Sequence, residues 1–132
     1  MYLKELMQGE KFAFYSIVKN LVSIDGEFTT DEQALVDGFL AEMSLERNQI
    51  NDIPVDDAIK MFSYSTASVR KKVFLELVGV TLCDDMLHQK EKEFLDKIAE
   101  SFLISEDDKN AIIRTVKDLL DIYKKMAVLV NK

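Results

Sequence analysis

The sequence predicts an all-α fold, built as a single domain over residues 1–132, and three observations lead to it. Apolar residues make up 48% of the chain, which is enough to form a core. Four glycines and one proline leave few tight turns for a β sandwich or barrel. Apolar residues recur at helical spacing, and no segment sustains the alternation typical of a strand. We therefore expect one bundle of about seven helices.

Seven segments carry this helical spacing, and a short docked segment precedes them before Gly9. Thr29 and Glu32 form a capping-box pattern, which marks the start of the second helix. Proline suits the first turn of a helix, so the fourth helix is expected to start at Pro54. The expected helices span residues 10–24, 30–43, 46–52, 54 onward, 68–83, 89–103 and, starting after Ser105, 106–130.

Three of these helices differ in how much of their surface is apolar. Much of 12–24 and nearly all of 74–83 is apolar all round, which is typical of a helix surrounded by protein. We expect these two helices to form the central pair. The last helix instead carries one apolar stripe from Ile112 to Val130, with lysines and aspartates mostly off it. That pattern predicts a surface helix lying against the core.

The sequence also resembles itself after a shift of about 59 residues. Acidic and apolar residues then recur in register over two helix–loop–helix units, at about 10–52 and 69–111. Internal similarity of this kind predicts two copies of one unit, here related by a pseudo-twofold axis. The matched pairs include Tyr15–Phe74, Asp25–Asp84, Phe28–Leu87, Glu32–Glu91 and Leu45–Ile104.

Charge and composition exclude several classes of protein. The chain has 17 Lys and Arg against 24 Asp and Glu, a net charge of −7, whereas a nucleic-acid-binding protein needs cations to neutralise phosphates. One Cys and one His cannot form a disulfide or an ordinary zinc site. No apolar run reaches about 18 residues, and Met1–Glu10 lacks the apolar core of a signal peptide. We expect a cytoplasmic protein without a transmembrane segment.

Two acidic loops are the candidates for chemistry. Asp25 and Asp84 each follow a central helix, where a carboxylate faces the negative end of the helix dipole at a cost of about 0.3–1 kcal/mol. Either the backbone N–H groups that follow compensate, as in an Asx turn, or a divalent cation joins Asp25 to Glu32 and Asp84 to Glu91. The candidate cations are Ca²⁺, Mg²⁺ and Mn²⁺. Helix capping is the structural alternative for both glutamates.

The first loop partly matches the calcium loop of an EF-hand. Asp25, Gly26 and Glu32 agree with its last eight positions, including the glycine and the terminal glutamate. The first ligand position would be Leu21, and in the second copy Val80, and neither side chain can ligate calcium. A cation site in these loops would therefore differ from a standard EF-hand.

The loops read Asp-Gly-Glu-x-Thr-x-x-Glu at 25–32 and Asp-Asp-x-Leu-x-x-x-Glu at 84–91, each between two helices. This paired pattern resembles the tellurite-resistance TerB-like family over roughly residues 10–120. The resemblance implies an all-helical fold, no established enzymatic activity, and divalent-metal binding through the residues here numbered Asp25, Glu32, Asp84 and Glu91. The same fold occurs beside DnaJ-type co-chaperone modules. Asp85 stands where the second copy would prefer glycine, which puts the second site in doubt.

The remaining reactive residues give little support for an enzyme. Cys83 and His88 lie five residues apart, but no third orienting group or oxyanion site accompanies them. A run of three cations, Arg70, Lys71 and Lys72, is either a solvated face or a small docking patch for an acidic partner or lipid headgroup. The sequence thus predicts a non-enzymatic, TerB-like interaction or stress-response module with an unidentified protein partner. A scaffold that binds no metal and a metal-dependent hydrolase with clustered carboxylates are the alternatives.

Overall fold

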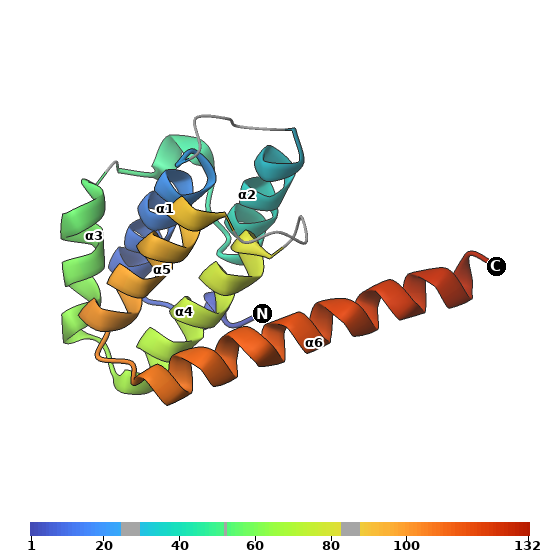
Figure 1. Ribbon diagram of the computed structural model, residues 1–132. Helices are drawn as coiled ribbons and strands as arrows, with labels where there is room; N and C mark the ends of the chain where they lie inside the picture. Colours follow the sequence, from blue (N-terminus) through green and yellow to red (C-terminus); the bar gives the residue numbers. More distant parts are fainter. Residues whose placement is uncertain (25–29, 52, 83–87) are drawn as a thin grey trace.

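The computed structural model describes residues 1–24, 30–51, 53–82 and 88–132, and these residues form helices without a strand (Figure 1). The all-α class is therefore confirmed for the described part of the chain. The α-helices are α1 (Gln8–Val22), α2 (Thr30–Glu42), α3 (Val55–Met61), α4 (Ala67–Thr81), α5 (Gln89–Ser101) and α6 (Glu106–Val130). Short 3-10 helices are η1 (Leu3–Glu5), η2 (Arg47–Gln49) and η3 (Phe62–Tyr64).

Residues 46–52 do not form the expected α-helix. The described residues there form only the three-residue turn η2, and none of its residues is buried. Ile50 packs partly against the core, but it is the one apolar residue among 46–51, so no apolar stripe stabilises an α-helix and a short connecting turn forms instead. The next helix, α3, starts at Val55 rather than at Pro54. Pro54 is its N-cap and has an extended backbone (ψ 140°). The described α-helices thus number six rather than about seven.

α1 and α4 lie at the centre of the core, as their apolar sequences predict. α1 contacts α2, α3 and α4, while α4 contacts α1, α5 and α6. Phe14, Phe74 and Leu77 on these two helices are fully buried. Burial of a large apolar side chain stabilises a fold by about 1.5–3 kcal/mol. The central pair therefore supplies much of the hydrophobic stabilisation.

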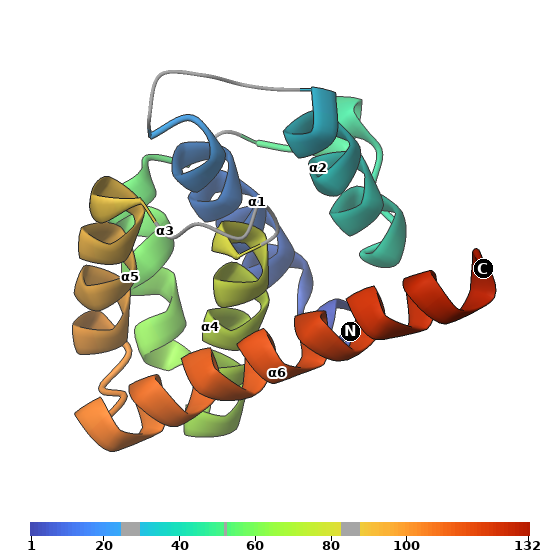
Figure 2. The ribbon, with the colours of Figure 1, turned by 45° about the vertical axis from the view of Figure 1, so that its right-hand side comes forward.

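α6 packs on the bundle with its first half only. Ile112, Ile113 and Leu120 are partly buried against the core, and Val116 is buried. Every residue from 121 to 132 is exposed, and two views show this half extending past the other helices (Figures 1 and 2). The surface-helix prediction is therefore right for the first half of α6. None of the helices in the described ranges, α6 included, is both long and apolar enough to cross a membrane.

A shift of 59 residues carries the bounds of α1 and α2 onto those of α4 and α5. After the second helix of each pair, Ser44 and Leu103 adopt left-handed backbones with φ of 57° and 58°. The next N–H groups, of Leu45 and Ile104, each donate back into the preceding helix at 2.9 Å. This is the pattern of a Schellman-type helix end. The two halves thus share helix lengths and helix ends, while the pseudo-twofold axis itself stays a prediction.

Candidate functional site

Two of the four predicted metal ligands lie in the described part of the chain. Glu32 is the third residue of α2, and Glu91 is the third residue of α5. Both are partly buried, and the Glu91 carboxylate lies 4.0 Å from Nε2 of His88. Asp25 and Asp84 lie outside the described residues. The structure therefore places the two glutamates in equivalent first turns and does not test the four-residue set.

The first turn of a helix favours a carboxylate whether or not a metal is bound. Its free N–H groups and the positive end of the helix dipole stabilise a negative charge by about 0.3–1 kcal/mol. His88 is the N-cap of α5, and its side chain accepts no capping hydrogen bond. Within the described ranges, no group of three or more His, Cys, Asp or Glu side chains could hold a metal ion. A metal site at Glu32 or Glu91 would need the aspartates of the neighbouring loops.

A pair of carboxylates that the sequence did not single out holds the amino terminus. The Met1 amine lies 2.8 Å from the Glu42 carboxylate and 2.9 Å from that of Glu76. The backbone N–H groups of Tyr2 and Leu3 donate to Glu76 and Glu42, each at 2.9 Å. Glu76 is only 8% exposed, so these partners offset the cost of burying its charge.

The electrostatics of this cluster follow from its geometry. Burial alone would raise the pKa of Glu42, but hydrogen bonds from the Met1 amine and the Leu3 N–H hold it below its usual value. Burial alone would lower the pKa of the Met1 amine, but hydrogen bonds to Glu42 and Glu76 raise it. The one sequence signal for this cluster was Glu76 itself, a lone charge inside an apolar helix. Its partners are 74 positions away in the chain and could not be inferred.

The cationic run 70–72 is not a free docking patch. The Arg70 guanidinium donates to the carbonyl oxygens of Phe102 at 3.0 Å and Ser65 at 2.6 Å. Lys71 pairs with Asp108, and Lys72 pairs with Glu5, each at 3.0 Å. Arg70 therefore has a structural role, and the charges of the two lysines are already balanced.

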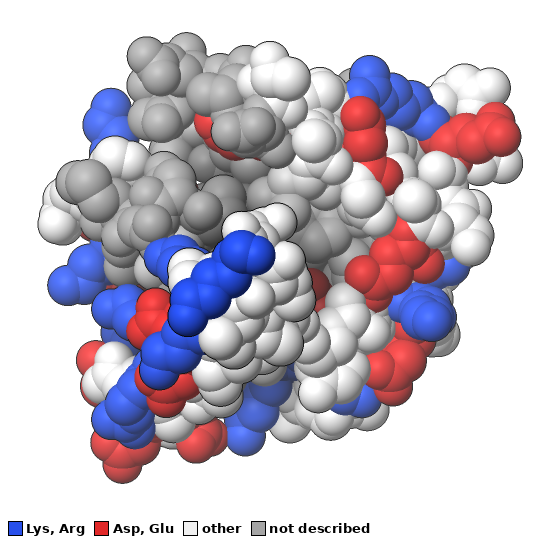
Figure 3. All heavy atoms as spheres, turned by 90° about the vertical axis from the view of Figure 1, so that its right-hand side faces the viewer, with Lys and Arg blue, Asp and Glu red and all other residues white. Residues whose placement is uncertain are grey.

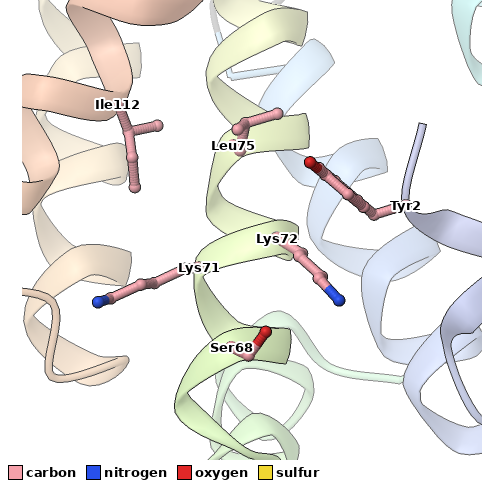
Figure 4. Close-up of a pocket in the computed structure, with 6 residues that line it drawn as sticks. All are labelled: Tyr2, Ser68, Lys71, Lys72, Leu75 and Ile112. Atoms are coloured by element: carbon pink, nitrogen blue, oxygen red, sulfur yellow. The ribbon is translucent and has the colours of Figure 1, made fainter.

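A shallow groove of about 430 Å³ lies over α4, between α6 and the amino-terminal segment (Figure 4). Lys71 and Lys72 point to opposite sides of α4, and Leu75 and Ile112 supply the apolar part of the lining. Tyr2 and Ser68 complete the lining. The ammonium groups of Lys71 and Lys72 in this lining are ion-paired, with Asp108 and Glu5. The groove thus joins apolar and charged side chains and could contact an amphipathic ligand.

Most of the large apolar side chains that are exposed in the described part of the chain lie on the second half of α6. Their exposed fractions there run from 45% at Met126 to 80% at Val130. Exposed apolar side chains that gather on one side of a helix are typical of an interaction site. We call this surface the α6 tail; its residues are Ile122, Tyr123, Met126, Leu129 and Val130, which share one side of the helix, whereas the exposed Val128 lies on the opposite side.

Comparison with protein-family models, with curated proteins and with solved structures finds no match to this chain. The resemblance to the TerB-like family therefore stays a resemblance. The features that bear on function are the α6 tail, the two first-turn glutamates and the carboxylate pair at the amino terminus.

Proposed function

We propose that this protein is a non-enzymatic, cytoplasmic interaction module of the TerB-like type with a role in stress response. The observation that carries the proposal is the α6 tail. An isolated helix of about ten residues is marginal in water, so a helix end with an exposed apolar side gains stability by packing against a partner.

Site-specific photocrosslinking tests the use of this face. A photoreactive amino acid at Tyr123 lies on the apolar stripe of α6, and one at Val128 lies on the opposite face as a matched control. The proposal expects adducts in living cells from position 123 and few from 128. Equal or absent adducts at both positions would count against an interaction module that works through α6.

Divalent-cation binding is the second part of the proposal, with Asp25 and Glu32 at one loop and Asp84 and Glu91 at the other. Its support is the equivalent position of the two glutamates, each the third residue of its helix and each partly buried. Carboxylate oxygens suit Ca²⁺, Mg²⁺ and Mn²⁺. A scaffold without metal is the second candidate, because helix N-termini favour these glutamates even when no ion is present.

Metal titration separates the two candidates. Ca²⁺, Mg²⁺ and Mn²⁺ are added to metal-free protein while the melting temperature and amide NMR shifts are followed. An ion that binds the native state alone must raise its stability. The variant Glu32→Gln/Glu91→Gln should lose the response, and Glu93→Gln/Glu100→Gln, with the same charge change on the exposed side of α5, should keep it. A wild-type protein that millimolar metal leaves unchanged would favour the metal-free scaffold.

A further inference from the structure

We propose that the partner of the α6 tail is the α6 tail of a second copy of this chain, so that two chains associate through antiparallel α6 helices. This inference rests on the proposed interaction module and names its partner. The argument uses the spacing of the apolar residues, the direction in which they face, and the distribution of charge.

The spacing in α6 is that of helices that pack against one another. Apolar residues recur in alternate steps of four and three, at positions 112, 116, 119, 123, 126 and 130. This 3.5-residue repeat keeps one seam facing a partner helix. The first positions are used within the chain, where Ile112 and Val116 pack against the core. The same seam then continues without cover through Tyr123, Met126 and Val130.

The residues beside this seam do not oppose pairing with an identical helix. In packed helices, charged residues at the flanking positions normally determine which helices pair, and like charges there prevent a helix from pairing with an identical copy. Here the flanking positions of the tail hold Ile122, Ala127 and Leu129. The apolar face is thus wide and uncharged, as in bundles of more than two helices. Two tails and the two bodies beside them would cover such a face.

The direction of the seam favours a protein segment over a lipid surface. Val116, Tyr123 and Val130 are seven residues apart, so the exposed residues face nearly the same side of α6 as the buried ones. That side is the one on which the body lies (Figure 2). A flat membrane would meet the body before it reached the seam, whereas a second helix fits beside α6.

Charge complements this arrangement. Residues 122–132 contain Lys124, Lys125 and Lys132 and no acidic residue, a charge of +3. Because the whole chain carries −7, the first 121 residues carry −10. Figure 3, which faces the free end of α6, shows a row of Lys and Arg side chains, with some acidic ones among them, beside an uncharged surface. Each cationic tail would therefore approach an acidic body when two chains pair in opposite directions.

Sedimentation velocity of the full chain tests the pairing. Over about 1 µM to 1 mM, which covers moderate to weak association, the wild type should reach a mass twice the 15.2 kDa of one chain. Met126→Lys should weaken association at least about tenfold, which is 1.4 kcal/mol. Val128→Lys adds the same charge two residues away on the opposite face and should leave association unchanged. Circular dichroism and melting temperature check that each variant is folded.

Three outcomes would overturn the pairing. One is a wild type that stays at 15.2 kDa throughout the range, and another is association that Met126→Lys does not weaken. The third is a monomer that binds vesicles of anionic phosphatidylglycerol through Tyr123 and Met126, which would make a lipid surface the occupant. The interaction module would survive the first outcome if position 123 still crosslinked to a different protein. It would fail if that position gave no adduct at all.

Discussion

At the scale of single residues, two cationic side chains donate hydrogen bonds to carbonyl groups at the ends of α2 and α5. Lys11 donates to the carbonyl of Met43 at 2.9 Å, and 59 positions later Arg70 donates to that of Phe102 at 3.0 Å. Each carbonyl lies just past the end of the second helix of its pair, where intrahelical partners run out. A cation also suits the negative end of the helix dipole. The same contact thus stabilises both halves of the fold.

Removing either cation should weaken the fold. Lys11→Met and Arg70→Met keep an apolar side chain but remove the donors, and each should lower the free energy of unfolding by about 1–2 kcal/mol. Lys19→Met, on the exposed side of α1, should change it by less than about 0.5 kcal/mol. Urea denaturation measures all three. Equal small effects at the three positions would mean that the carbonyl contacts contribute nothing.

The carboxylate of Glu42 should make the free energy of unfolding depend on pH in the acidic range. Its pKa is lower in the folded protein than its usual value of 4.5, so the unfolded chain binds more protons below that pH. The stability it contributes is therefore present above pH 4.5 and is lost as pH falls through the folded pKa. Glu42→Gln should flatten urea-measured stability over this acidic window. A wild type and variant with parallel pH profiles would rule out the contribution.

Sequence patterns predicted few of these contacts between single residues. Lys11 reaches Met43 across 32 positions, and Arg70 reaches Phe102 across the same distance. Nothing in a local pattern distinguishes such a cation from a solvated one, which is why Arg70 was expected to be free. A repeat detected in the apolar residues could have indicated it, because Lys11 and Arg70 are themselves 59 positions apart.

At the scale of helices, apolar spacing located the six described α-helices to within a few residues. Thr66 and Ser105 accept hydrogen bonds from Val69 and Asp108 and fix the starts of α4 and α6. The ends were harder to predict, because Ser44 and Leu103 take the left-handed position that glycine usually fills. Residues 46–52 failed for a related reason. Helical propensity without an apolar face to bury was not enough to form an α-helix there.

The left-handed residue after α5 offers a test at this scale. Leu103 is 83% exposed with φ 58°, a conformation that costs a residue with a Cβ roughly 1 kcal/mol. Leu103→Gly should therefore raise the melting temperature, and Leu103→Asn should raise it less. Leu103→Val should lower it, since a branched side chain tolerates this backbone poorly. Thermal unfolding gives the order, and a stabilising valine would contradict the helix-end assignment.

At the scale of the whole molecule, composition predicted the fold class, and the two helices that are apolar all round predicted the central pair. The four-residue metal set stays a prediction, since half of it lies outside the described residues. The sequence also showed the apolar stripe of α6 but not that half of it would be uncovered. Whether the stripe is buried within the chain depends on how far the neighbouring helices extend along α6. The sequence pattern of the stripe is the same whether the same chain or a partner buries it.

Amide hydrogen exchange along α6, measured at low and at high protein concentration, tests the central claim most directly. Residues 109–120 pack on the body, so their amides should be protected at both concentrations. The side chains of residues 122–130 are exposed in a single chain, so the amides there should exchange rapidly in dilute protein and slowly in concentrated protein. Exchange in 122–130 that is the same at every concentration would contradict an interaction surface on α6 that a second copy covers.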